Sequence, residues 1–141
     1  MILYADTSAI IPLVIDEPTS ERCHRLWPDA IRRVSARTTY VEAAAAVASA
    51  VRAFRIDEDE AQLTFSRLDA MWAGVDIVEI DEPMMRAAAA CAREFRLRGH
   101  DAIQCASALR IAGIDVVATS GDRALLRAWQ ETGLAVADTA G

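Results

Sequence analysis

Four acidic residues stand where an expected strand ends or an expected helix begins, and carboxylates at such positions can bind a metal ion. Asp6 directly follows the short apolar run of residues 2–5, and Asp122 comes just after another apolar run. Asp101 opens one expected helix, and Glu42 lies in the first turn of another. Oxygen ligands without cysteine or histidine suit Mg²⁺ or Mn²⁺ rather than zinc. A bound divalent ion can activate water for attack on a phosphodiester and neutralise charge on the leaving oxygen.

These acids are informative as a group, because most of them have an ordinary explanation when taken singly. Asp101 and Asp122 are good helix N-caps, and Glu42 is favourable in the first turn of a helix. Asp6 is harder to explain in this way, since it ends an apolar strand instead of starting a helix. Two carboxylates about 4 Å apart repel by about 4 kcal/mol at an effective dielectric of about 20. Four of them in one pocket would require a divalent cation or raised pKa values.

The elements that must position these acids alternate between strand and helix along the chain. Apolar runs predict strands over residues 2–5, 31–35, 76–80, 116–118 and 134–137. Capping residues and helical periodicity predict helices over residues 8–15, 20–27, 40–54, 58–74, 82–95, 101–112 and 122–132. Turns are expected at Pro28-Asp29 and Thr119-Ser120-Gly121, and helix ends at Gly113 and Gly133. Repeated strand–helix units predict an α/β fold with a mostly parallel sheet between two helical layers, and ligands bind at the carboxyl edge of such sheets.

Composition bounds the class of protein. With 141 residues and an apolar fraction of 53%, the chain is expected to form one globular domain. No apolar run approaches the roughly 18 residues of a membrane span, and the N-terminus lacks the basic start of a signal peptide, so a cytoplasmic location is expected. Three cysteines and two histidines are too scattered for a zinc site. The absence of lysine excludes a Walker A loop, a Schiff-base enzyme and a receiver domain.

The basic residues are few but all of one kind. A net charge of −6 argues mildly against general affinity for nucleic acids. All 15 basic residues are arginine, which binds phosphate through two parallel hydrogen bonds, so local phosphate contacts remain open. Arg37 and Arg123 lie near the expected edge of the acidic pocket and are candidates for such contacts. Simple solvation of both side chains is an equally good interpretation.

Four short motifs together resemble the PIN-domain nucleases and, among these, the VapC-type toxins of bacterial toxin–antitoxin pairs. The motifs are Tyr4-Ala5-Asp6-Thr7-Ser8, Thr38-Thr39-Tyr40-Val41-Glu42, Gly99-His100-Asp101-Ala102-Ile103-Gln104-Cys105-Ala106 and Ser120-Gly121-Asp122-Arg123-Ala124-Leu125. No single motif is specific. The resemblance lies in their order and spacing, which span essentially the whole chain. It implies a three-layer α/β/α PIN-like fold.

The resemblance also implies roles for individual residues. Asp6 and Asp101 would coordinate Mg²⁺ or Mn²⁺ directly, while Glu42 and Asp122 would complete the pocket directly or through water. Ser8 and Ser120 would orient the carboxylates. The implied activity is cleavage of RNA by a homodimer, which a small cognate antitoxin of the VapB kind would inhibit.

Two other functions remain open at this point. The first is a housekeeping PIN nuclease in RNA processing, and the second is a catalytically idle PIN-like module that binds RNA or a partner protein. A phosphatase of the haloacid-dehalogenase type is excluded, because its second aspartate would stand where this chain has Ser8 and because it needs a lysine.

Overall fold

The computed structural model describes residues 1–141 and is built around one parallel sheet. Its strands are β1 (Ile2–Ala5), β2 (Arg32–Ala36), β3 (Asp76–Val78), β4 (Val116–Ser120) and β5 (Ala135–Asp138). They are hydrogen-bonded in the order β3-β2-β1-β4-β5, and every neighbouring pair is parallel. The chain therefore winds from β1 toward one side of the sheet and later returns to the other side through β4. In such sheets the crevice at this reversal, between β1 and β4, is the favoured place for a ligand.

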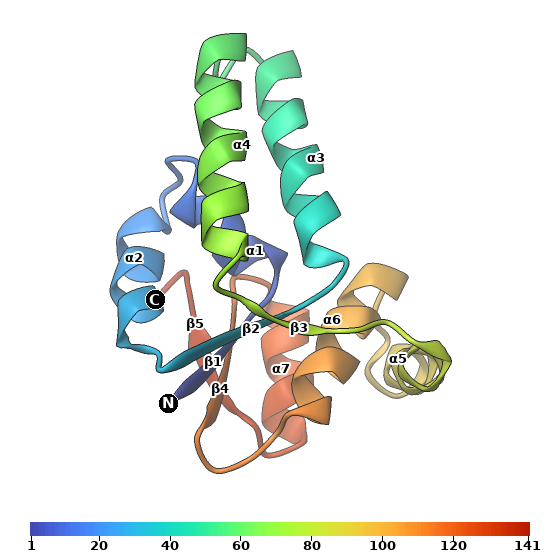
Figure 1. Cartoon of the computed structure of the whole chain (residues 1–141). Helices are drawn as coiled ribbons and strands as arrows, with labels where there is room; N and C mark the ends of the chain where they lie inside the picture. Colours follow the sequence, from blue (N-terminus) through green and yellow to red (C-terminus); the bar gives the residue numbers. More distant parts are fainter.

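Helices cover both faces of the sheet and extend beyond it (Figure 1). They are α1 (Thr7–Ile10), the 3₁₀ helix η1 (Ile11–Leu13), α2 (Ser20–Asp29), α3 (Thr39–Arg52), α4 (Glu58–Trp72), α5 (Glu82–Phe95), α6 (Gly99–Arg110) and α7 (Arg123–Glu131). No helix has both the length and the apolar character needed to cross a membrane. The three-layer α/β/α architecture expected from the sequence is confirmed, with a sheet that is parallel throughout.

Two apolar cores form on either side of the sheet because its strands are apolar on both faces. The larger core packs α5, α6 and α7 against one face, and Tyr4 and Trp129 meet there edge to face with ring centroids 5.9 Å apart. The smaller core joins Ala5 and α1 to the facing sides of α3 and α4, through residues such as Val47 and Leu68. This second core fixes the α3–α4 hairpin relative to the end of β1, where Asp6 follows.

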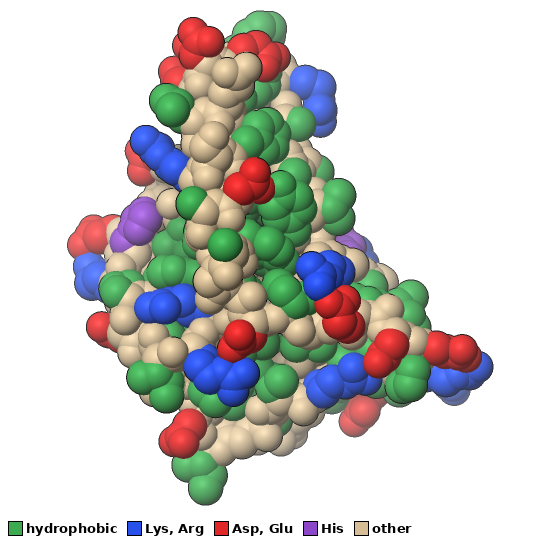
Figure 2. Space-filling model, in the orientation of Figure 1, with side chains coloured by type: hydrophobic (Ala, Val, Ile, Leu, Met, Phe, Trp, Pro, Cys, Tyr) green, Lys and Arg blue, Asp and Glu red, His purple; other side chains and the backbone are tan.

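The α3–α4 hairpin projects from the body of the molecule (Figure 1). Asp57 caps α4 by accepting a 2.8 Å hydrogen bond from the Glu60 amide, and acidic residues fill the first turn of that helix. Acidic side chains accordingly gather at the tip of the hairpin, whereas basic and acidic side chains alternate over the lower part of the same view (Figure 2). Part of the net negative charge thus lies at the far end of the hairpin.

Several expected boundaries were wrong. Pro28 and Asp29 do not form a turn but are the last two residues of α2, which ends one residue after the proline. Thr119 and Ser120 extend β4, because Thr119 pairs with both β1 and β5 and Ser120 pairs with Asp138 of β5. Gly113 lies beyond the end of α6 at Arg110 and does not have a positive φ, whereas Gly133 follows α7 with a φ of 84° as expected.

Candidate active site

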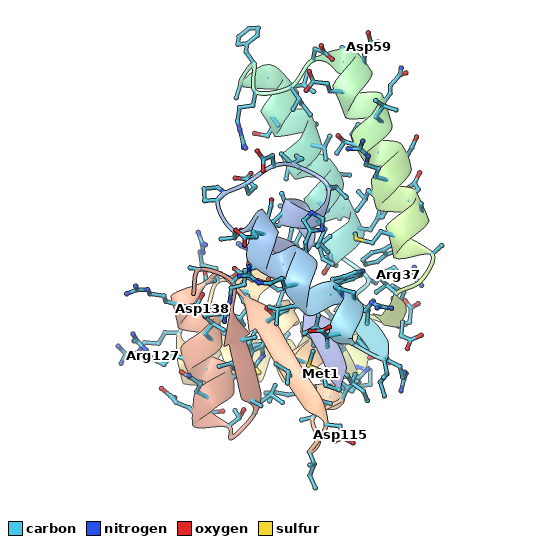
Figure 3. All side chains as sticks on the ribbon, turned by 90° about the vertical axis from the view of Figure 1, so that its left-hand side faces the viewer. Met1, Arg37, Asp59, Asp115, Arg127 and Asp138 are labelled. Atoms are coloured by element: carbon cyan, nitrogen blue, oxygen red, sulfur yellow. The ribbon has the colours of Figure 1, made fainter.

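The crevice between β1 and β4 brings together residues more than a hundred positions apart. Ala5 at the end of β1 pairs with Thr119 in β4, and the Asp6 amide donates a 3.2 Å hydrogen bond to the Thr119 carbonyl. Met1 and Asp115, which precede β1 and β4, mark the amino edge of the sheet in Figure 3, while Asp138 marks the carboxyl edge nearer the hairpin. The carboxyl edge is therefore the one that carries Asp6.

Asp6 is buried, with 5% of its surface exposed, and both of its carboxylate oxygens are hydrogen-bonded. The Ser8 hydroxyl donates to Oδ1 at 2.7 Å, and the Ser120 hydroxyl donates to Oδ2 at 2.8 Å. The Ala9 amide adds a 3.2 Å hydrogen bond to Oδ1. The pKa of Asp6 is raised to about 7, mainly by burial and to a smaller extent by the Asp122 charge, against the lowering effect of these hydrogen bonds. The ionised form of Asp6 is thus costly in the protein alone, and a nearby cation would stabilise it.

Ser8 and Ser120 also tie Asp6 to the start of α7. Ser8 Oγ accepts a 2.8 Å hydrogen bond from the Gly121 amide, and Ser120 Oγ accepts a 2.9 Å hydrogen bond from the Asp122 amide. The two hydroxyls lie 3.3 Å apart. Each serine therefore donates a hydrogen bond to Asp6 and accepts one from a backbone amide, which fixes the direction in which both hydroxyls point.

Asp6 and Asp122 cap helices and Asp101 does not, and this outcome differs from expectation for Asp6 and Asp101. Asp122 caps α7, with a 2.9 Å hydrogen bond from the Leu125 amide to Oδ1, so the capping interpretation holds for this residue. Asp6 both ends β1 and caps α1. Asp101 does not open its helix, because α6 begins at Gly99 and its N-cap is Arg98. The capping alternative for Asp101 is therefore wrong.

Asp101 and Glu42 are each held by few contacts. The Asp101 carboxylate, 15% exposed, lies 3.4 Å from Arg98 Nε and 3.4 Å from His100 Nε2, and both of these basic side chains are exposed. Glu42 occupies the first turn of α3, as expected, and its Oε2 accepts a 2.7 Å hydrogen bond from the Thr7 hydroxyl. Since Thr7 directly follows Asp6, this contact links α3 to the end of β1.

The four acids are too dispersed to form a complete set of metal ligands by themselves. No group of three or more aspartate, glutamate, histidine or cysteine side chains is arranged to hold an ion. Mg²⁺, however, commonly keeps several waters and binds one or two carboxylates directly, so the oxygen-only chemistry of this edge fits such an ion. Direct coordination by Asp6 and Asp101 stays a prediction.

Comparison with known proteins identifies the fold family. The PIN domain family matches residues 3–129. The chain belongs to the PIN-domain family. Two proteins of Mycobacterium tuberculosis, named Ribonuclease VapC45 and Ribonuclease VapC49, are each 32% identical over 124 residues, which cover 88% of this chain and 86% of theirs.

Solved structures share the fold of this PIN domain. FitAcB from Neisseria gonorrhoeae superimposes with a TM-score of 0.73 at 19% identity, over 99% of this chain and 98% of that one. VapBC-1 from nontypeable Haemophilus influenzae does so with a TM-score of 0.64 at 18% identity, over the full length of both. At such low identity these likenesses establish the fold alone.

The two arginines expected near the site have different surroundings in this PIN domain. Arg37 follows β2 at the carboxyl edge and forms an ion pair with Glu79, in which both side chains are more than half exposed. Arg123 is the first residue of α7, next to Asp122, and makes no ion pair. Arg123 is therefore free to contact a phosphate, whereas Arg37 would have to leave its carboxylate. An RNA contact by either residue stays a prediction.

Two residues at the site were not singled out by sequence reasoning, although both lie in the quoted motifs. Thr7 directly follows Asp6, and its hydroxyl contacts Glu42. Gln104 lies three residues after Asp101 and is 2% exposed. The signal was a single amide in the otherwise apolar stretch between Ala102 and Ala106, since a buried polar group must find hydrogen-bond partners.

Proposed function

We propose that this PIN domain is a Mg²⁺- or Mn²⁺-dependent endoribonuclease and the toxin of a toxin–antitoxin pair. The observation that carries the metal-dependent activity is Asp6, a buried carboxylate at the β1–β4 crevice whose two oxygens are oriented by Ser8 and Ser120. A carboxylate held in this way, with its pKa raised to about 7, is suited to binding a cation rather than to stabilising the fold. Two relatives named ribonuclease at 32% identity support RNA as the substrate.

In this proposal each acid and each serine of the site has a separate role. Asp6 and Asp101 hold the ion, while Glu42 and Asp122 contact it directly or through water. The bound ion would supply an activated water and neutralise charge on the scissile phosphate. Ser8 and Ser120 keep the Asp6 oxygens pointed in fixed directions, which lowers the cost of organising the site when substrate binds.

The phosphate backbone of RNA needs positive groups at the rim of an otherwise acidic site. Arg123, exposed and without an ion-pair partner at the start of α7, would take this part. Arg37 would join it by exchanging Glu79 for a phosphate, because the pair is exposed and such pairs are worth only about 0–1 kcal/mol.

The proposed partners are a small antitoxin protein and a second copy of the chain. The structural likeness to a chain of a toxin–antitoxin complex from Klebsiella pneumoniae, with a TM-score of 0.60 at 17% identity, supports the antitoxin. Coexpression with the product of a small neighbouring gene should yield a complex that copurifies and does not cleave RNA. Light scattering of the free protein should give the mass of a dimer.

Induced expression in a host without the antitoxin tests the activity. Growth should stop and new RNA 5′ ends should map to discrete positions, and purified protein should cut total RNA only when Mg²⁺ or Mn²⁺ is present. Cleavage with no growth defect would instead favour the housekeeping nuclease. A folded protein that neither cuts RNA nor responds to Mn²⁺ would support the idle binding module and end the proposal.

A further inference from the structure

A largely buried hydrogen-bond network ends at Glu42, and Gln104 of α6 lies at its centre. Gln104 Oε1 accepts a 2.6 Å hydrogen bond from the Tyr4 hydroxyl. Its Nε2 donates to Thr39 Oγ1 at 2.8 Å and, over a longer 3.4 Å, to Thr7 Oγ1. The Thr7 hydroxyl in turn donates to Glu42 Oε2 at 2.7 Å. One side chain thus joins β1, the first turn of α3 and the helix that carries Asp101.

The direction of each hydrogen bond in this network follows from the number of protons available. Glu42 is a carboxylate and only accepts, so Thr7 must donate its single hydroxyl proton to Glu42. Thr7 Oγ1 can then only accept from Gln104, which requires the amide nitrogen on that side. The amide oxygen consequently faces Tyr4. A flipped amide would place a second acceptor beside Thr7, whose single proton could then satisfy only one of Glu42 and Gln104.

The other branch of the network anchors Gln104 to the backbone of β1. Ser35 Oγ lies 2.6 Å from the Ala5 carbonyl and 2.8 Å from Thr39 Oγ1. Since a carbonyl only accepts, the Ser35 proton goes to Ala5, and Thr39 gives its proton to Ser35. Thr39 Oγ1 is then left to accept from Gln104. Tyr4, Ser35, Thr39 and Gln104 are all buried, so the amide has no water with which to exchange these partners.

We propose that Gln104 is a positioning residue for the nuclease site. Through Thr7 it orients the Glu42 carboxylate of α3 relative to Asp101, which lies on α6 together with Gln104. This inference rests on the proposed function. Glutamine suits the position because it offers one acceptor to Tyr4 and two donors to the threonines. An apolar side chain of similar size, such as methionine, would leave Thr7 without a fixed orientation and Glu42 free to turn.

A purely structural role for Gln104 makes a different prediction, and kinetics separates the two. At saturating Mn²⁺ and with an RNA oligonucleotide substrate, Gln104→Met and Thr7→Val should each lower kcat about tenfold and change KM less than about twofold, since only orientation is lost. Thr7→Ser keeps the hydroxyl and should restore most of kcat. Thr64→Val removes a buried helical threonine hydroxyl that bonds the Glu60 carbonyl far from the site, and should leave kcat unchanged.

The double variant Gln104→Met/Thr7→Val decides whether the two residues act in one chain. Its kcat should be no more than about twofold below that of the less active single variant, because the effects of two substitutions that break the same interaction do not add. Multiplying losses, with kcat lowered about a hundredfold, would overturn the inference. So would a Gln104→Met protein that melts at a lower temperature but keeps the wild-type kcat at temperatures where it is folded.

A spectroscopic measurement without metal or RNA tests the network independently of the activity. The side-chain amide resonances of Gln104, identified by their loss in Gln104→Met, should shift in ¹⁵N-labelled Thr7→Val and Glu42→Gln proteins. Thr64→Val should leave them in place. Gln104 resonances that do not shift in either the Thr7→Val or the Glu42→Gln protein would refute the connection to Glu42. If wild-type protein cuts no RNA while these shifts occur, the proposed function fails and the hydrogen-bond network stands.

Discussion

The two halves of the candidate site are built differently. The strand half comprises Asp6, Ser8, Ser120 and Asp122, at the ends of β1 and β4, and the helix half comprises Glu42 on α3 and Asp101 on α6. In the strand half, Asp6 is buried and hydrogen-bonded through both oxygens. In the helix half, each carboxylate is partly exposed. Glu42 is held by one short hydrogen bond, and Asp101 by two 3.4 Å contacts to the exposed side chains of Arg98 and His100.

The strand half is therefore oriented by the fold itself, whereas the helix half needs a bound ligand to fix its carboxylates. The strand half carries an electrostatic cost in the folded protein, because burial opposes the charge on Asp6. Neighbouring parallel strands and two serines keep it rigid despite that cost. The helix half costs little to fold, and its carboxylates depend on side-chain partners for their direction. Stability should therefore respond to changes in the strand half, whereas activity should respond to changes in both halves.

The largest expected effect is the loss of activity on removing one charge from either half. Asp6→Asn and Asp101→Asn should each lower RNA cleavage at least about a thousandfold, since each weakens the hold on a catalytic cation. Cleavage of total RNA with excess Mn²⁺ measures the loss, and circular dichroism checks the fold. Asparagine keeps the shape of aspartate and caps helices equally well, so a capping role would survive the change. A folded Asp101→Asn protein with near wild-type cleavage would remove Asp101 from the site.

The second effect distinguishes the halves through pH. The pKa of Asp6 is raised from 3.8 to about 7 in the folded protein. Asp6 therefore does not oppose folding below about pH 4, where it is neutral in both states, and the free energy of unfolding falls as the pH rises from about 4 through 7. In the absence of metal, Asp6→Asn should therefore gain stability over wild type on going from pH 5 to pH 8. Urea unfolding with a chelator present measures this difference. Asp101→Asn is the matched control, and an equal gain in that variant would contradict the contrast between the halves.

Metal binding should offset the cost of the strand half. An ion that binds only the native state stabilises it by about 2.7 kcal/mol at a hundredfold excess over Kd. The melting temperature of wild-type protein should accordingly rise by several degrees with Mn²⁺ at pH 8, and much less in Asp6→Asn. Differential scanning calorimetry gives both values. Equal shifts in the two proteins would place the ion elsewhere.

The smallest effect concerns how tightly the strand half is packed. A Cβ on Gly121 would lie 2.8 Å from Thr139 Oγ1, and Thr139 is buried at the end of β5. Gly121→Ala should therefore cost about 1 kcal/mol of unfolding free energy. The same change in a Thr139→Ala background should cost clearly less, because the obstructing hydroxyl is gone. Urea unfolding of the four proteins measures the coupling, and equal costs in both backgrounds would show that Gly121 is not confined by Thr139.

Much of the fold and part of the site follow from local patterns in the sequence. The apolar runs ending at Ala5 and before Thr119 predict two strands, and a parallel sheet then brings Asp6 and Asp122 to the same edge. Local patterns were less informative about boundaries. Asp101 was expected to open α6, yet the helix begins at Gly99, because the first turn of a helix tolerates many residue types and its exact start depends on packing.

The sequence by itself therefore determined the family and the layered α/β architecture, since periodicity and motif order are properties of the chain alone, and it predicts that the four acids share one site. Only the tertiary structure decided that Asp6 is buried with a raised pKa and that Gln104 meets Tyr4, a residue 100 positions away. Such contacts depend on strand register and on the rotation of α6 about its axis. Those quantities are set by how whole elements pack together, and a local run of residues does not encode them.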